Sequence, residues 1–175
     1  AYRTEQLMSE DFVESCGAIL FDLGDPKNRK VCLIRTRQDG QWHLAKGRRN
    51  HGESRHDAAL REVTEETGHR CHLFPVTMAT RATHPDLPAQ VKDVARVYDH
   101  LTESFACQIR HIRSKTKIIW WYIAALDQAE DTEMQAGEPQ WEPVFFPLVD
   151  AVHTPTYQQD REILAKAMHL VVSTL

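Results

Sequence analysis

Residues 47–69 read GRRNHGESRHDAALREVTEETGH and place a glycine-containing loop directly before a glutamate-rich helix. Apolar residues recur at helical spacing from Ser54 to Thr67. Ser54 is the predicted N-cap, and Gly68 is the predicted end of the helix, because glycine adopts the left-handed conformation that closes many helices. The side expected to face the core carries His56, Ala59, Leu60, Val63 and Thr67.

Three glutamates of this helix are spaced so that their carboxylates share one face. Glu62, Glu65 and Glu66 are related by steps of three and four residues. Gathering the three charges costs Coulomb energy on the order of 1 kcal/mol per pair. A hard divalent cation offsets that cost, and Mg²⁺ is the usual ion when phosphates complete its coordination. The alternative is a solvated acidic face, and glutamate spacing alone leaves both interpretations open.

The whole segment resembles the Nudix box, a 23-residue pattern of fixed glycines, glutamates and one arginine. Seven fixed positions at average residue frequencies of about 6% give a chance match on the order of 10⁻⁹ per start site. His69 departs from the pattern, because the family has an apolar residue at this position. The matching residues are Gly47, Glu53, Arg61, Glu62, Glu65, Glu66 and Gly68, with Val63 in the first apolar position.

The resemblance implies the Nudix fold, an α/β architecture with a mixed β-sheet between α-helices, in a single domain over residues 1–175. It also implies that Glu62 and Glu66 bind Mg²⁺ or Mn²⁺ together with the backbone carbonyl of Lys46. Glu65 resembles a position that acts as the base on the attacking water in several members and is a metal ligand in others. The residues that resemble supports of the loop and helix are Glu53 and Arg61.

Hydrolysis of a phosphoanhydride needs the functions that such a helix offers. Negative oxygens hinder attack on phosphorus, and metal ions offset their charge and lower the pKa of a bound water. A nearby carboxylate then accepts the proton. We therefore expect direct attack of water on phosphorus, no covalent intermediate and two phosphorylated products.

Charge is unevenly distributed along the chain. Residues 27–49 contain eight lysines and arginines and one acid, whereas residues 127–142 contain six acids and no lysine or arginine. Such separation favours local attraction of an anionic ligand over a nonspecific nucleic-acid coat, with a soluble hairpin rim as the alternative. Arginine forks suit clustered phosphates. The predicted substrate-binding residues are Arg35, Thr36, Arg37, Lys46, Arg48, Arg49, Lys115 and Lys117.

The predicted substrate is a highly anionic phosphorylated small molecule. Residues 42–48 resemble the segment that enters the box in diadenosine polyphosphate hydrolases and diphosphoinositol polyphosphate phosphohydrolases, although Ala45 replaces the proline that many of them carry. Residues 35–37 resemble a phosphate-contacting segment of the diphosphoinositol enzymes. We expect a pyrophosphohydrolase of diphosphoinositol polyphosphates and also of dinucleoside polyphosphates.

Other activities remain open. Pro85 lies where relatives that cleave ADP-ribose often have a proline, so ADP-ribose or another nucleoside diphosphate is one alternative. A silent Nudix fold that senses nucleotide or polyphosphate is another, although retention of three glutamates argues against it. An RNA enzyme is not favoured, because no aromatic and basic RNA-binding module is found. The alternative candidates for the base in the acidic stretch are Glu130, Glu133 and Glu138.

Outside the box, short apolar runs bounded by turn residues indicate strands. We predict an exposed loop at 127–142. The expected strands are 15–22 and 31–37 as a hairpin, 71–80 interrupted near Pro75, 117–126 and 143–148. The expected helices are 91–101 and 157–173, the second with Ile163, Leu164, Ala167, Leu170 and Val171 inward.

Composition is that of a globular protein, with 42% apolar and 26% charged residues. The sequence contains no apolar run of about eighteen residues, so no membrane helix is predicted. The four cysteines lack metal-binding spacing. They weakly favour a reducing compartment, and hence the cytoplasm. Secretion with a leader that is later removed is the alternative. Oligomeric state is not indicated.

Overall fold

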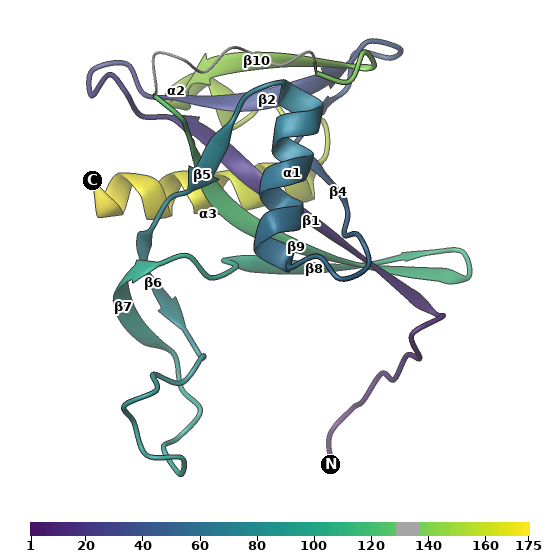
Figure 1. Ribbon diagram of the computed structural model, residues 1–175, viewed down its shortest axis with the longest axis vertical. Helices are drawn as coiled ribbons and strands as arrows, with labels where there is room; N and C mark the ends of the chain where they lie inside the picture. Colours follow the sequence, from purple (N-terminus) through teal and green to yellow (C-terminus); the bar gives the residue numbers. More distant parts are fainter. Residues whose placement is uncertain (129–136) are drawn as a thin grey trace.

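The computed structural model describes residues 1–128 and 137–175 (Figure 1). The main sheet contains β1 (Phe12–Asp22), β2 (Lys30–Thr36), β3 (Trp42–His43), β4 (Lys46–Arg48), β5 (Cys71–Leu73), β8 (Ala106–Ile112), β9 (Lys115–Leu126) and β10 (Trp141–Pro147). A separate hairpin contains β6 (Val76–Thr80) and β7 (Arg96–Leu101), and the helices are α1 (Arg55–Thr67), α2 (Leu148–Ala151) and α3 (Gln158–Thr174).

The centre of the sheet is the parallel pair of β1 and β9, in register from Phe12–Thr116 to Phe21–Ala125. The strand order is β10-β2-β1-β9-β5, with β3 beside β2, β4 beside β1 and β8 beside β9. Pairings other than β1–β9 are antiparallel, so the sheet is mixed. The predicted hairpin of the first two strands is confirmed by the pairing of Phe21 with Val31.

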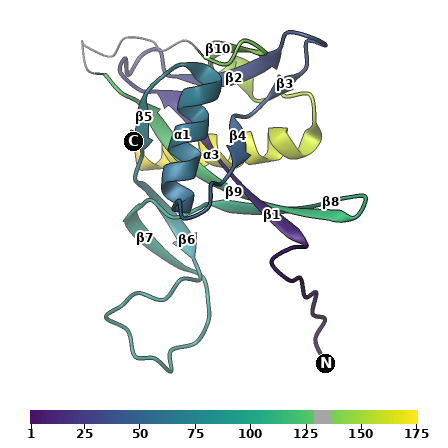
Figure 2. The ribbon, with the colours of Figure 1, turned by 45° about the vertical axis from the view of Figure 1, so that its right-hand side comes forward.

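The two faces of β1 point to different helices because side chains alternate along a strand. Cys16, Ala18 and Leu20 pack in one cluster with Ala58, Ala59 and Val63 of α1. Ile19 and Phe21 pack in the other with Leu164, Ala167 and Leu170 of α3. Figure 2 shows α1 in front of the sheet and α3 behind it. The predicted α/β sandwich between helices is confirmed.

The box folds as a loop followed by α1, with both predicted caps in place. The Ser54 hydroxyl accepts a hydrogen bond from the Asp57 amide at 3.1 Å, and Gly68 ends the helix with φ 77°. The predicted inner face is partly wrong, because Ala58 is fully buried and His56 is exposed. His56 covers the edge of the core instead, with its ring 4.9 Å from that of Tyr122.

Two other sequence expectations are corrected. Residues 91–101 do not form a helix, because 96–101 pair with β6 as strand β7. Strand β8 was missed in the sequence, although its burial alternates as expected for a strand with one covered face. The strand expected at 143–148 begins two residues earlier, at Trp141. The expected acidic loop at 127–142 lies partly outside the described residues, and Glu130 and Glu133 are among those left out.

Among the residues that the structure describes, no helix is both long and apolar enough to span a bilayer.

Candidate active site

Gly47 and Glu62 are in direct contact where β4 passes the inner side of α1. A β-carbon at position 47 would lie 2.0 Å from Glu62 Cδ, so only glycine leaves room for this carboxyl group. Glycine is needed here for space, because the close neighbour is the glutamate itself. Glu62 is 9% exposed and Glu66, one helical turn later, is 7% exposed. The sequence therefore places two nearly buried carboxylates side by side.

Burial makes these carboxylates hard to ionise. It raises the pKa of Glu66 to about 8, an effect that the nearby Glu62 charge reinforces. Burial also raises the pKa of Glu62, although Arg61 opposes the shift. The backbone N–H of Lys46 donates to Glu66 Oε2 at 3.1 Å, which orients that carboxylate toward β4. A cation placed beside both groups would favour their charged forms.

Arg61 organises the outer side of the site with all of its guanidinium nitrogens. Its Nε and Nη2 bind the Glu53 carboxylate at 2.7 and 2.9 Å, and Nη1 donates to Glu62 at 2.8 Å and Glu65 at 3.1 Å. Nη2 also donates to the Arg48 carbonyl at 2.9 Å. The hydrogen bonds from Arg61 lower the pKa of Glu53 to about 2. Arg61 thus ties the loop, β4 and the helix together.

Glu65 is more exposed than the other two glutamates, although it shares Arg61 Nη1 with Glu62. Its side chain is 45% exposed and turned toward Arg61. Within residues 1–128 and 137–175, no group of three or more His, Cys, Asp or Glu side chains is arranged to hold a metal. Of the three expected acids, Glu62 and Glu66 thus line one depression, and the role of Glu65 as a metal ligand stays a prediction. A pair is compatible with Mg²⁺, which commonly takes one or two carboxylates and completes its shell with waters and substrate phosphates.

The carboxylate pair faces a depression with cationic walls, which we call the phosphate depression. Burial lowers the pKa of Lys117, and the charges of Arg110 and Arg48 lower it further. Burial likewise lowers the pKa of Lys46, with Lys117 and Arg110 adding to the effect. These cations repel one another, so an anion between them would be stabilising. The charged residues that line the depression are Lys46, Arg48, Arg49, Glu62, Glu66, Lys117 and Glu138.

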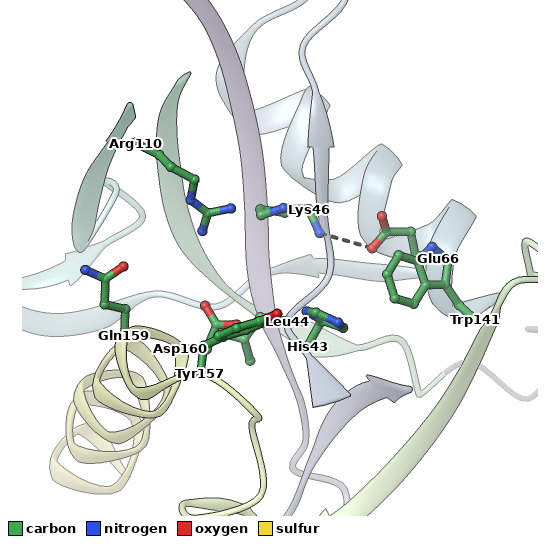
Figure 3. A pocket seen from close by; sticks show the side chains of 9 residues that line it. All are labelled: His43, Leu44, Lys46, Glu66, Arg110, Trp141, Tyr157, Gln159 and Asp160. Carbon is green, nitrogen blue, oxygen red and sulfur yellow. Dashed lines mark hydrogen bonds between the residues drawn. The ribbon is translucent and has the colours of Figure 1, made fainter. Parts of the chain in front are cut away.

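A second hollow of about 470 Å³, the aromatic cavity, adjoins the depression (Figure 3). The ring of His43 lies 5.6 Å from that of Trp141 and 5.9 Å from that of Tyr157. Lys46, Glu66 and Trp141 line both hollows. A molecule with a ring system in one hollow and a phosphate chain in the other could thus extend across Glu66. The remaining residues that line the cavity are Leu44, Arg110, Gln159 and Asp160.

The structure brings together only half of the expected substrate-binding residues. Lys46, Arg48, Arg49 and Lys117 line the phosphate depression. The residues that line neither of the two hollows are Arg35, Thr36, Arg37 and Lys115.

These four residues have other contacts. The Arg35 guanidinium lies 5.9 Å from the Trp42 ring centroid. The Thr36 hydroxyl bonds to the Asp39 carboxylate in the turn after β2. Arg37 Nε donates to the Pro139 carbonyl at 2.9 Å, so it supports the chain beside Glu138. Lys115 lines a different surface hollow near the start of β1. The structure therefore does not place residues 35–37 in either hollow, and a binding mouth there stays a prediction.

Five charged or aromatic residues of the aromatic cavity were not predicted as site residues. Arg110 reaches it from β8, the strand that the sequence interpretation missed. The strand's sequence ACQIRHI does not alternate between apolar and polar residues, although its burial does, so no sequence signal for that strand was available. His43, Trp141, Tyr157 and Asp160 come from three separate segments, and no sequence spacing links them.

Comparisons with known proteins identify the family to which this fold belongs. Residues 15–167 match the family model for the NUDIX domain. The chain is similar to an 8-oxo-(d)GTP phosphatase of Mycolicibacterium smegmatis, at 30% identity over 131 residues. This match covers 70% of the chain and 39% of the relative, so the chain spans well under half of that protein's length.

Solved structures share the fold at low sequence identity. An Ap4A hydrolase of C. elegans has a TM-score of 0.57 and 16% identity, covering 92% of this chain and 98% of that one. The ORF135 protein of E. coli has a TM-score of 0.56 and 18% identity, covering 93% of each chain. A UDP-X diphosphatase has a TM-score of 0.54 and 17% identity, covering 97% of this chain and 65% of that one. The chain belongs to the Nudix family of hydrolases.

Proposed function

We propose that the protein is a metal-dependent hydrolase that cleaves a phosphoanhydride bond in a nucleotide-type substrate. The observation that carries this proposal is the position of Glu62 and Glu66. Both carboxylates are nearly buried, lie side by side and open onto the cationic depression, and Glu66 also lines the aromatic cavity. A phosphate chain beside Glu66 therefore has cations around it and room for an attached ring.

Glu62 and Glu66, with the backbone carbonyl of Lys46, would hold Mg²⁺ or Mn²⁺. When bound, such an ion offsets phosphate charge and lowers the pKa of a water. The protein's own part is positioning, because Arg61 holds Glu62 at 2.8 Å and Gly47 leaves the space that this carboxylate occupies. Lys46 and Lys117 would neutralise phosphate oxygens in the ground state and as charge shifts to the leaving group.

We assign the proton acceptor for the attacking water to Glu138. Glu138 lines the phosphate depression, and its charge contributes to the raised pKa values of Glu62 and Glu66. Glu65, the sequence candidate, lines neither hollow and is paired with Arg61 at 3.1 Å. The Glu138 backbone N–H donates to the Glu65 carbonyl at 2.9 Å, which places this residue next to α1. Glu65 would then strengthen the Arg61 network.

A nucleotide is favoured as the substrate because three aromatic rings line the second hollow. Its volume of about 470 Å³ lies within the usual range of small-molecule sites. The named relatives point the same way, since one is an 8-oxo-(d)GTP phosphatase and another an Ap4A hydrolase. Dinucleoside polyphosphates and nucleoside diphosphate derivatives such as ADP-ribose fall within this class.

Diphosphoinositol polyphosphates are the second candidate. The observation in favour is the set of four cations around the carboxylate pair, which exceeds what a single diphosphate needs. The observation against it is the position of Arg35 and Arg37, which face other parts of the protein. The two candidates differ in what occupies the aromatic cavity, because an inositol ring is saturated, carries charged phosphates and does not stack as a nucleobase does.

The test is a substrate panel of nucleoside di- and triphosphates, dinucleoside polyphosphates, ADP-ribose and diphosphoinositol polyphosphates with Mg²⁺ or Mn²⁺. Products are followed by ion chromatography. We expect nucleotide cleavage that Glu66→Gln abolishes and that Glu162→Gln, on the exposed side of α3, leaves intact. Tight binding of nucleotides without turnover would show that the protein is a nucleotide sensor and not a hydrolase. Hydrolysis of inositol pyrophosphates alone would reverse the order of the two candidates.

A further inference from the structure

Asp160 is a buried carboxylate that the proposed chemistry does not use. It lies in the first turn of α3, is 7% exposed and lines the aromatic cavity. In the part of the chain that the structure describes, its side chain makes no hydrogen bond and no ion pair within 4.0 Å. No fully buried polar side-chain atom there lacks a partner, so the carboxylate oxygens of Asp160 are open to the cavity. Figure 3 shows Asp160 with Arg110 and Lys46 across the cavity.

This carboxylate is kept in place at an energetic cost. Burial raises the pKa of Asp160, even though the charges of Lys46, His43 and Arg110 act in the opposite direction. Partial burial weakens the solvation of this charge, which is unfavourable unless a ligand or a cation compensates for it. Asparagine would fill nearly the same space without the charge. A carboxylate that faces an open cavity is instead suited to bind hydrogen-bond donors of a ligand.

We propose that Asp160 accepts hydrogen bonds from the N–H edge of guanine in the aromatic cavity and thereby selects guanine nucleotides over adenine nucleotides. This inference rests on the proposed function, because it assumes a nucleotide substrate. An ionised carboxylate offers only acceptors. Guanine presents two adjacent donors, N1–H and the 2-amino group, and the pair matches the two oxygens as in a bidentate contact.

Adenine does not offer the same edge. Its N1 is an acceptor beside the 6-amino group, so one carboxylate oxygen would face a lone pair. A site that hydrogen-bonds one ligand rejects an analogue that leaves its buried polar group unpaired. Inosine nucleotides keep N1–H and lack the 2-amino group, and they are therefore expected to be intermediate.

The rest of the cavity is consistent with a base held at Asp160. The rings of His43 and Trp141, with centroids 5.6 Å apart, both line the cavity and give it an aromatic wall. Lys46 and Glu66 line both the cavity and the phosphate depression. A base beside Asp160 therefore directs its phosphates toward the carboxylate pair.

A purely structural role makes a different prediction. If Asp160 only balanced the charge of Lys46 and His43, its loss would alter all nucleotides alike. Base selection instead changes the ratio between guanine and adenine substrates. It also changes binding of nucleoside monophosphates to the metal-free protein, where no hydrolysis occurs.

The experiment compares kcat/KM for GTP, ITP and ATP in the unchanged protein, Asp160→Asn, Asp160→Ala and Glu162→Gln. Glu162 lies on the same helix, bonds to Gln158 at 3.2 Å and lines neither of the two hollows, so Glu162→Gln matches the charge change without touching the cavity. Binding of GMP and AMP without metal is measured by calorimetry, and thermal unfolding checks that each variant folds.

We expect GTP to be preferred over ATP by about 10- to 100-fold or more, since a hydrogen bond to a charged group is worth roughly that factor. Asp160→Asn should reduce the ratio at least about tenfold, mainly through KM, while Glu162→Gln keeps it. A GTP/ATP ratio near one, or a ratio unchanged in both Asp160 variants, would overturn the inference and leave the hydrolase proposal standing. If GMP binding depends on Asp160 but no nucleotide is hydrolysed, the inference is supported and the proposed hydrolase function is ruled out.

Discussion

Gly47 and Glu62 occupy adjoining space so closely that a β-carbon on Gly47 would lie 2.0 Å from Glu62 Cδ. Gly47→Ala should therefore push Glu62 out of the carboxylate pair. We expect weaker Mn²⁺ binding and a fall in kcat of about 100-fold, because displaced ligands lose both affinity and activity. Isothermal titration with Mn²⁺ and steady-state kinetics measure the two effects.

Gly52 supplies the matched control. It has φ 79°, but a β-carbon added at this position would meet no atom within 4 Å among the described residues. Gly52→Ala should lower the free energy of unfolding by about 1 kcal/mol through backbone strain, with metal affinity unchanged. Equal effects of the two substitutions on Mn²⁺ binding would show that space beside Glu62 is not what position 47 protects.

Arg61→Lys should damage the site although it preserves the charge. A lysine ammonium cannot bind the Glu53 carboxylate in two places and also reach Glu62 and the Arg48 carbonyl. We expect kcat to fall by about 10- to 100-fold, as for partners that orient metal ligands, with a smaller change in KM. Arg55→Lys is the control, because Arg55 also makes two hydrogen bonds to one carboxylate, from Nε and Nη2 to Glu14 Oε1. Loss of activity of equal size in both variants would indicate general destabilisation.

Glu138→Gln should reduce kcat by about 100-fold or more, because it removes the proposed proton acceptor. Glu65→Gln should have a smaller effect, since Glu65 is 45% exposed and its contact is with Arg61. The pH profile of kcat distinguishes them, and only Glu138→Gln should lose the limb that reports the base. The reverse order of the two variants would return the role of the base to Glu65.

Glu66 predicts how stability of the metal-free protein varies with pH. Its folded pKa is raised to about 8 from an ordinary value of 4.5. Between these values the folded state holds more protons than the unfolded state, so stability is greatest near the lower limit and falls as pH rises toward 8. The size is on the order of a few kcal/mol, given the free energy of one pKa unit.

Glu66→Gln should flatten that slope, and Mg²⁺ should reverse part of it because the ion binds the charged form. Below pH 4.5 the opposite holds for Glu53, whose pKa is lowered to about 2, so its contribution to stability is lost as pH falls. Thermal unfolding between pH 2 and 9 measures both limbs. An unchanged slope in Glu66→Gln would contradict the buried position of this carboxylate.

Removing both Arg35 and Arg37 should leave nucleotide cleavage within about twofold, because neither side chain lines the two hollows. Lys46→Ala with Lys117→Ala should raise KM by about tenfold or more, since half-buried cations that bind phosphate contribute charge-assisted hydrogen bonds. A strong effect of the arginine pair on inositol pyrophosphate cleavage alone would revive the second candidate substrate.

The box itself could be interpreted from the sequence because its information is local. Ser54 and Gly68 cap α1, and the spacing of Glu62 and Glu66 places both on one helical face whatever surrounds the helix. The continuous apolar run of β1 likewise predicts a strand covered on both faces. Local patterns therefore indicated an α/β domain and the acidic face of α1, and the resemblance of the box added the Nudix fold.

The substrate cavity was decided by the tertiary structure. Arg110 and Asp160 are fifty residues apart, and they meet only because β8 pairs with β9 while α3 packs across the same sheet. Arg35 matched a phosphate-binding segment in sequence, but its strand directs it to Trp42 instead. Helical spacing acts over a few residues, whereas the lining of a cavity depends on strand register and packing between distant segments, which no short motif encodes.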